Sequence, residues 1–290
     1  RWQNSVTEVT LENVGLRPRG NFSREAQRKS WKLDFNEFVP GRSFFGLEEM
    51  DLNGDNNDPT LMRRMLSHEF MRRMELPVSR THYVAIYMND QFWSLNIHVE
   101  AIDEEYVDHW FGNNNGNLYK CLFAGSPADL RFRSEEDYQT LGGGETYRET
   151  NNDPDSDYTD LITFIGFLNN SPSQTICQQL HTVLNVDGVL RYFASNVALG
   201  SWDDYWYGSN NFYLYNNEST GAFELIPFDY DNTVGIDFFG TDWSSRNYNN
   251  WGDGGFGSTP APLAAEIFRH SNLRRQYRRY LADAAEILSD

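Results

Sequence analysis

Two aspartates separated by one residue, Asp229 and Asp231, follow an apolar stretch that ends at Pro227. In an extended backbone, side chains two residues apart lie on the same face, so both carboxylates could bind one cation. Carboxylate oxygens are hard ligands, and Mg2+ takes a few of them together with phosphate oxygens and water. The alternative is a solvated turn, because aspartate and asparagine are common where a strand ends.

An acidic pair and an asparagine precede these aspartates in the chain. Asp203 and Asp204 come first, Asn211 follows after a short loop, and a pair of short strands then leads to Asp229. This order is typical of a kinase phosphotransfer site. There the first aspartate accepts the proton of the substrate hydroxyl, while the asparagine and the later aspartate hold the metal on the phosphates. A His-Arg-Asp triplet is absent from the sequence, which excludes an ordinary eukaryotic-type kinase.

Apolar patterns indicate the elements that must position these residues. Apolar residues alternate with polar ones over 31–35, which predicts a strand with Lys32 on its polar face. Asp58 is a good N-cap and is followed by proline, so we expect a helix from Asp58 to about Met74 that carries Glu69.

A hairpin and several helices are expected further along the chain. The hairpin spans residues 82–99, turns at Asn89-Asp90 and leads to Glu100. Two short strands are expected at 212–215 and 222–227, and helices at about 158–168, 187–199 and 262–289.

Four stretches between about residues 15 and 235 combine these features. They are Arg19-Gly20-Asn21 with KSWKLDF at 29–35; DPTLMR at 58–63 with Pro77, Arg80 and Thr81; VEAID at 99–103 with GNLYK at 116–120; and Asp203-x-Tyr205 with NFYLY at 211–215 and PFDYD at 227–231. On these motifs the chain resembles the CotH family, the spore coat protein H-like atypical kinases. The only three lysines of the chain, Lys29, Lys32 and Lys120, all lie within them. Phe228 stands where the family usually has tryptophan.

The resemblance implies an α+β protein with a reduced, two-lobed protein-kinase-like fold. Within a single domain it implies a strand-rich N-lobe over about 1–100 and a mainly helical C-lobe over about 101–290. The implied activity is metal-dependent transfer of the ATP γ-phosphate to Ser residues of a protein substrate, with Mg2+ or Mn2+ and with Ca2+ as a further option. Because the chain begins close to the Arg-Gly-Asn strand, we expect N-terminal strands of the family to be missing.

The resemblance also assigns roles to individual residues. Asp203 matches the catalytic-loop aspartate. Metal ligation falls to Asp229 and Asn211, with Asp231 as a second carboxylate. Lys32 or Lys29 would reach the phosphates, and the remaining residues expected at the nucleotide are Arg19, Glu69 and Glu100.

An acidic composition limits the possible partners. The chain has 42 Asp and Glu against 24 Lys and Arg, a net charge of −18. Nucleic acids and anionic lipids require a positive surface, so neither is expected as a partner. No segment approaches the roughly 20 apolar residues that span a bilayer, so membrane insertion is not expected either. Cys121 and Cys177 could form one disulfide in a secreted protein or remain two buried thiols.

A different class of function fits part of the sequence as well. Loops rich in Asn, Asp and Gly, together with many aromatic residues, would suit a secreted or cell-surface binding or adhesion module with little or no catalysis. The stretch 51–58 superficially resembles a calcium loop, but it lacks the glycine at position 6 and the glutamate at position 12 of an EF-hand. On either interpretation, we expect the protein at the cell surface or outside the cell.

Overall fold

The computed structural model describes residues 1–20, 26–151, 158–257 and 260–290, and it divides the chain into two compact units. The first unit comprises Arg1–Met62 and Ser79–Ala101, and the second comprises Arg63–Val78 and Ile102–Asp290. Asn21, which belongs to one motif of the family resemblance, lies outside the described residues.

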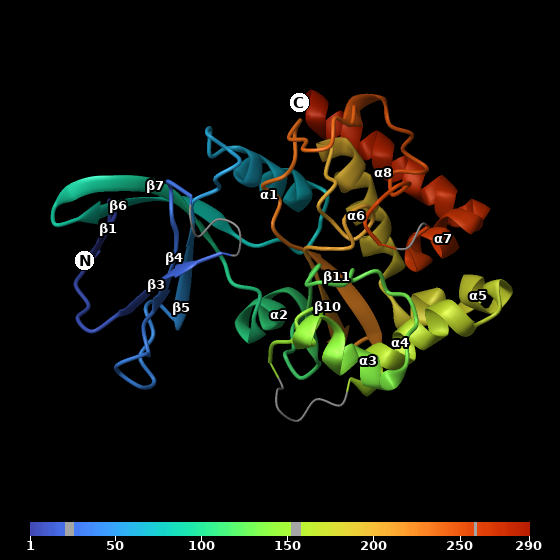
Figure 1. The fold of residues 1–290 in the computed structure, drawn as a ribbon, viewed down its shortest axis with the longest axis horizontal. Coiled ribbons are helices and arrows are strands. Elements are labelled where there is room, and N and C mark those ends of the chain that lie inside the picture. The colour runs from blue at the N-terminus through green and yellow to red at the C-terminus, as the bar shows by residue number, and fades with distance from the viewer. Residues whose placement is uncertain (21–25, 152–157, 258–259) are drawn as a thin grey trace. The chain divides into compact units, whose positions relative to one another are not determined.

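An antiparallel sheet forms the first unit (Figure 1). Its strand order is β3-β4-β5-β7-β6, and β1 and β2 pair separately. The strands are β1 (Trp2–Gln3), β2 (Glu8–Val9), β3 (Gly15–Arg19), β4 (Ser30–Asp34), β5 (Glu49–Asn53), β6 (Thr81–Met88) and β7 (Gln91–Val99). The predicted strand around Lys32 is thus confirmed as β4, and the predicted hairpin is confirmed as β6 and β7.

Side chains that point to one face of the sheet form the core of this unit. Met50 and Leu52, two residues apart on β5, are buried together with Phe35 and Phe44. The rings of Phe35 and Phe44 lie 5.1 Å apart. In the register of the sheet, Lys32 lies opposite Asp51 on β5 and Arg17 on β3.

Helices surround a second antiparallel sheet in the other unit (Figure 1). The sheet has the order β11-β10-β8-β9, from β8 (Leu118–Cys121), β9 (Tyr147–Glu149), β10 (Phe212–Asn217) and β11 (Ala222–Pro227). The helices are α1 (Arg63–Arg73), α2 (Glu104–Phe111), α3 (Glu135–Thr140), α4 (Thr159–Asn170), α5 (Ser173–Val183), α6 (Val186–Leu199), α7 (Pro262–Arg269) and α8 (Ser271–Ser289). The fold is therefore a mixed α/β fold, whereas its kinase-like arrangement remains a prediction.

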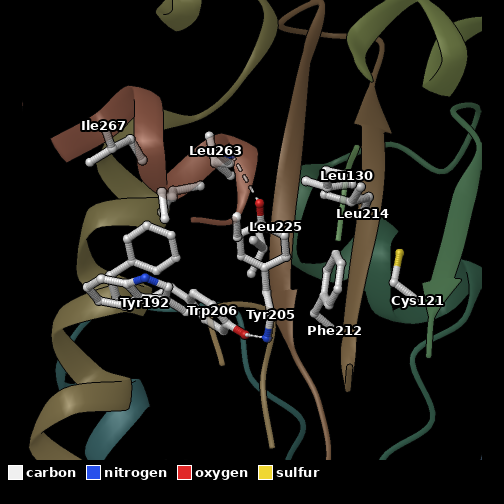
Figure 2. Close-up of a cluster of buried hydrophobic side chains, with 14 of the residues drawn as sticks. Cys121, Leu130, Tyr192, Tyr205, Trp206, Phe212, Leu214, Leu225, Leu263 and Ile267 are labelled. Atoms are coloured by element: carbon white, nitrogen blue, oxygen red, sulfur yellow. Dashed lines mark hydrogen bonds between the residues drawn. The ribbon is translucent and has the colours of Figure 1, made fainter. Parts of the chain in front are cut away.

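Aromatic side chains dominate the core of the second unit (Figure 2). The ring of Phe193 on α6 stacks on Trp206 at 4.5 Å, and Trp206 stacks on Phe268 of α7 at 4.9 Å. Cys121 is buried in the same core, and both cysteines are free thiols. Among the described residues, no helix is both long and apolar enough to cross a membrane.

Helix α1 starts later than the sequence indicates. Asp58 does not cap it, because its Oδ1 accepts hydrogen bonds from the amide and the hydroxyl of Thr60, and Leu61 has a φ of 57°, which interrupts helical geometry. The helix begins at Arg63 and groups with the second unit rather than with the strand-rich part of the chain. On this helix the apolar Leu66 is 51% exposed, whereas Arg64 is buried.

The remaining predicted elements are confirmed with smaller shifts. The strands at 212–215 and 222–227 are β10 and β11, and the helix at 158–168 is α4. Asn185, whose side chain accepts from the amide of Gly188, caps α6. The C-terminal helical region is broken at His270 into α7 and α8.

Candidate functional site

The segment that carries Asp203 follows α6 and is fixed from both sides. Gly200 ends α6 with a φ of 64°. The amide of Tyr205 donates to the Tyr192 hydroxyl at 3.1 Å, and the Tyr205 hydroxyl accepts from the amide of Leu263 at 3.1 Å (Figure 2). That hydroxyl also donates to the Asp129 carbonyl at 3.4 Å, so the segment cannot shift without breaking buried hydrogen bonds.

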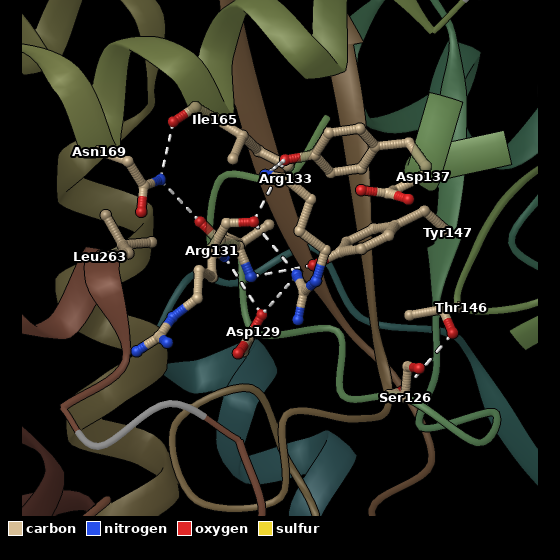
Figure 3. A network of polar contacts seen from close by, with 12 residues as sticks. Ser126, Asp129, Arg131, Arg133, Asp137, Thr146, Tyr147, Ile165, Asn169 and Leu263 are labelled. Carbon is tan, nitrogen blue, oxygen red and sulfur yellow. Dashed lines mark hydrogen bonds and ion pairs between the residues drawn. The ribbon is translucent and has the colours of Figure 1, made fainter. Parts of the chain in front are cut away.

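A polar network holds the neighbouring loop, which has no regular secondary structure (Figure 3). Asp129 is buried, and its Oδ1 accepts from the guanidinium of Arg133 at 2.9 Å and from the Arg131 amide at 3.2 Å. The amide of Leu130 donates to the Tyr147 hydroxyl at 2.9 Å. The network therefore supplies a rigid backing for Tyr205.

Asp204 points inward and has a structural role. It is fully buried, and its Oδ1 accepts from the amides of Trp206 and Tyr207 at 2.8 and 3.1 Å. Burial raises the pKa of this carboxyl to about 7, and the neighbouring charge of Asp203 acts in the same direction.

Asp203 is half-buried, and neutral amides hold both oxygens of its carboxylate. Asn210 Nδ2 donates to Oδ1 at 2.7 Å, and Asn232 Nδ2 donates to Oδ2 at 3.0 Å. Burial raises the pKa of Asp203, the charge of Asp229 raises it further, and the amide hydrogen bonds oppose both. A carboxylate with a raised pKa is a better proton acceptor than an exposed one.

Asn211 lies beside Asp203 in a left-handed backbone conformation. Its Nδ2 donates to the carbonyl of Asp203 at 3.2 Å, and its side chain is buried. Ser209, Asn211 and Asp229 have φ values of 50°, 52° and 62°. Asparagine and aspartate adopt left-handed geometry more readily than most residues with a side chain, so the unusual case here is Ser209.

Asp229 and Asp231 both reach the same cation, the guanidinium of Arg64 on α1. Arg64 Nη2 lies 2.6 Å from Asp229 Oδ1 and 3.7 Å from Asp231 Oδ2. The Arg64 side chain is 4% exposed, against 39% for Asp229. The expected extended backbone is wrong, because Asp229 is left-handed and a turn follows it, but the two carboxylates do converge on one positive charge.

The turn that carries these carboxylates is fastened to two helices. Tyr230 donates from its hydroxyl to Asn196 Oδ1 on α6 at 2.6 Å. The hydroxyls of Ser67 on α1 and Thr233 lie 3.0 Å apart, and both side chains are buried. This turn therefore keeps its shape independently of any bound ligand.

The oxygens assembled here suit a hard divalent cation. Within the described parts of the chain, no three or more His, Cys, Asp and Glu side chains are grouped to hold a metal. The family resemblance places a metal on Asp229, Asp231 and the amide oxygen of Asn211, with phosphate and water oxygens completing the shell, and this ligand set stays a prediction. Mg2+ and Mn2+ accept such a set, since Mg2+ takes one or two carboxylates together with substrate phosphates.

The residues expected at the phosphates lie in the first unit, where two of them pair with their own sheet. Lys32 forms an ion pair with Glu49 on β5, and Arg19 forms one with Asp51. The carbonyl of Lys29 accepts from Asn96 Nδ2 at 2.9 Å. Their role at a nucleotide stays a prediction.

Glu69 and Glu100 each have another partner in this structure. Glu69 pairs with Arg72 one turn along α1, at 2.7 Å and on an exposed face. Glu100 is buried and accepts from the amide of Arg80 at 2.9 Å and from its guanidinium at 2.9 Å. The expected contribution of both glutamates to nucleotide binding is untested.

Three residues of the site were not expected from the sequence. They are Arg64, Asn210 and Asn232. The asparagines did carry a signal, because each directly adjoins an expected metal ligand, Asn211 and Asp231 respectively.

Comparison with known proteins gives one family and two relatives. The family model described as "CotH kinase protein" matches residues 16–290. The inner spore coat protein H of Bacillus subtilis (strain 168) is 26% identical over 276 residues, which are 95% of this chain and 72% of that protein. The spore coat protein homolog 1 of Rhizopus delemar is 23% identical over 229 residues, 77% of this chain and 36% of that protein.

Proposed function

We propose that this chain, which belongs to the CotH family, transfers the γ-phosphate of ATP to serine residues of a protein substrate. A divalent metal would assist the transfer. The description of the family as kinase proteins supports the reaction class. The substrate class and the metal are the parts that the proposal adds.

A single observation carries the proposal. Asp203, held by two amides, and the pair Asp229 and Asp231, joined by Arg64, occur together in one unit. The charge of Asp229 acts on the pKa of Asp203, so the two carboxylates are close enough to interact. Phosphoryl transfer needs one carboxylate for the attacking hydroxyl and others for the metal.

Each carboxylate has its own task in this scheme. Asp203 accepts a hydrogen bond from the serine hydroxyl and takes its proton as the oxygen attacks the γ-phosphorus and the bond from that phosphorus to ADP breaks. Asn210 and Asn232 keep both carboxylate oxygens oriented for that step. Asp229, Asp231 and Asn211 would hold the metal, which would supply the positive charge that neutralises the phosphates.

Arg64 determines how Asp229 and Asp231 are arranged when no metal is bound. Its guanidinium offsets the repulsion between Asp229 and Asp231, so the two carboxylates are held together without a metal. This preorganisation reduces the cost of ordering the ligands during binding.

The names of the two relatives support a location at a coat or surface. We therefore propose that this protein also acts there, on a protein of the same layer. The acidic surface, with a net charge of −18, makes metal-bound ATP a better ligand than free ATP, because the metal reduces the negative charge of the phosphates.

The experiment that tests the proposal measures phosphate incorporation from γ-labelled ATP into serine-containing peptides, with Mg2+, Mn2+ or a chelator. We expect incorporation that requires metal and that mass spectrometry locates on serine. Incorporation that persists in the chelator, or label that is found only as free phosphate, contradicts the proposal.

A further inference from the structure

Four phenylalanines of the second unit are exposed although their rings touch one another. Phe123, Phe238, Phe239 and Phe256, here called the aromatic ridge, are 46%, 58%, 45% and 47% exposed. The ring of Phe256 lies 6.4 Å from Phe123 and 5.3 Å from Phe239, and Phe239 lies 6.4 Å from Phe238. Contiguous apolar surface of this kind marks an interaction site more often than chance exposure does.

Both ends of the aromatic ridge lead to Asp203. At one end, the backbone amide of Phe123 donates to Asn210 Oδ1 at 2.7 Å. Nδ2 of the same Asn210 side chain donates to Asp203 Oδ1. At the other end, Phe239 packs edge-on against Trp202 at 5.0 Å, and Trp202 directly precedes Asp203. The ridge is thus continuous with the carboxylate that we assign to the acceptor hydroxyl.

The loop that carries Phe256 is fastened to the segment of the catalytic aspartate. The amide of Phe256 donates to the Tyr207 carbonyl at 2.9 Å. A Cβ atom at Gly255 would lie 2.2 Å from that carbonyl, and one at Gly257 would lie 2.0 Å from Ser209 Oγ. These two glycines allow close backbone packing, so the ridge is preorganised.

The negative charge around the aromatic ridge limits the kinds of molecule that could bind there. Residues 228–257 contain five aspartates and a single cation, Arg246. The Arg246 guanidinium lies over the rings of Tyr207 and Trp243, at 5.1 and 5.2 Å. A second copy of this chain, with a net charge of −18, would be repelled, as would anionic lipid or nucleic acid.

We propose that the aromatic ridge binds the acceptor polypeptide and takes up an apolar side chain close to the serine that faces Asp203. The inference rests on the proposed function, because it uses Asp203 as the residue that receives the serine hydroxyl. Aromatic surfaces bind apolar side chains at a low entropic cost, since few torsions become fixed. The ridge would then select acceptor serines by their apolar neighbours.

A pair of synthetic peptides tests this inference. Both carry one central serine, which is flanked by leucines in one peptide and by glycines in the other. Binding without nucleotide is measured by fluorescence anisotropy, and phosphate transfer is measured in parallel. We expect wild-type protein to prefer the leucine peptide by about tenfold, the effect of a small apolar group in an apolar site.

Substitutions in the aromatic ridge test whether the ridge causes the preference for the leucine peptide. Phe239→Ser and Phe256→Ser should remove the preference for leucine and raise the KM for that peptide about tenfold, with the KM for ATP unchanged. Phe132→Ser is the matched control, because Phe132 is 40% exposed and lies outside the ridge. The comparison of the two peptides on wild-type protein needs no variant, so a folding defect cannot hide the answer.

The outcomes separate the ridge from the proposed function. If wild-type protein transfers phosphate equally to both peptides, the ridge inference is wrong and the kinase proposal stands. If no peptide is phosphorylated but the ridge variants lose binding of the leucine peptide, the kinase proposal fails and the ridge remains a polypeptide-binding surface. Equal binding of both peptides by wild-type and variant proteins overturns the inference.

Discussion

The two units hold their charged groups in different ways. In the first unit, Lys32 on β4 pairs with Glu49 of the adjacent strand β5, an ordinary cross-strand ion pair. Arg19 on β3 pairs with Asp51 of β5, two strands away in the same sheet. In the second unit, Asp203 is held by neutral amides, and a buried arginine holds Asp229 together with Asp231.

The two units differ in how easily a ligand could replace the partner of a charged side chain. A partly exposed ion pair contributes about 0–1 kcal/mol, so a phosphate group could replace Glu49 at Lys32 at little cost. In the second unit, Asn211 is buried and the Arg64 side chain that holds Asp229 is 4% exposed, so these side chains are harder to displace. The charged side chains of the first unit are therefore the more easily exchanged of the two sets.

The largest expected effect is on transfer through the second unit. Asp203→Asn keeps the shape of the side chain but removes the proton acceptor, so we expect phosphate transfer to fall about 10²–10⁴-fold. Affinity for metal-bound ATP should change little, because Asp203 contacts the acceptor rather than the metal. Steady-state kinetics and calorimetry on the same variant test both statements. Transfer at the wild-type rate would contradict the role of Asp203.

In the first unit, the strongest expected effect is on stability at low pH. Burial lowers the pKa of His98 from 6.5 to about 4, and the adjacent His82 contributes in the same direction. A native pKa below the unfolded value means that the native state binds fewer protons. The contribution of neutral His98 to the free energy of unfolding is therefore fully present above pH 6.5. It is lost as the pH falls towards 4, by about 3 kcal/mol in total.

Urea unfolding of wild-type protein and of His98→Phe between about pH 7 and pH 4 measures this dependence. The variant should lose less stability on acidification, whereas the exposed control His181→Gln should follow the wild type. Parallel curves for His98→Phe and wild-type protein would contradict the assignment.

Arg64 offers a way to sharpen the contrast between the units. Arg64→Gln removes a buried cation and leaves two carboxylates facing each other, so we expect a loss of about 2 kcal/mol of stability without metal. This lies below the range for a fully buried pair, because Asp229 is 39% exposed. Adding Mg2+ should recover part of the loss, since the metal supplies the missing charge. Arg269→Gln, which removes an exposed guanidinium paired with the buried Glu266, serves as the control in denaturant titrations.

Loss without recovery by Mg2+ would show that Arg64 is a packing residue and that Asp229 and Asp231 do not bind a metal as a pair. Recovery by Mg2+ in the Arg269→Gln control as well would show that the effect of the metal is general.

The smallest expected effect concerns the basic residues of the first unit. Lys32→Met should raise the KM for ATP about tenfold, the cost of one charge-assisted hydrogen bond, with a smaller change in kcat. Lys29→Met provides the comparison in the same initial-rate assay. If only Lys29→Met raises the KM, the phosphate contact belongs to Lys29 and the assignment of Lys32 is wrong.

Sequence order predicts Asp203, Asn211 and Asp229 as residues of the site, and their roles stay predictions. It does not predict Arg64. The face of a helix depends on where the helix begins, and the left-handed backbone at Leu61 moves the start of α1 to Arg63. The buried side of α1 therefore includes Arg64, while the apolar Leu66 is 51% exposed.

Periodicity also has a limit in irregular segments. The hairpin of β6 and β7 was predicted almost to the residue, since alternation and the Asn-Asp turn define it. Asn210 and Asn232 lie in irregular segments, where the direction of a side chain follows from individual backbone angles rather than from a repeat. Their contacts with Asp203 emerge only from the folded chain.

The most direct test of the account is calorimetry of ATP binding with Mn2+, with Mg2+ and with a chelator, on wild-type protein, Asp229→Asn and Asp203→Asn. Asp283→Asn, an exposed carboxylate on α8, is the control. The account predicts binding that requires metal, is retained in Asp203→Asn and the control, and is lost in Asp229→Asn. Binding without metal, or unchanged binding of metal-bound ATP by Asp229→Asn, would contradict the claim that this aspartate holds the metal on the phosphates.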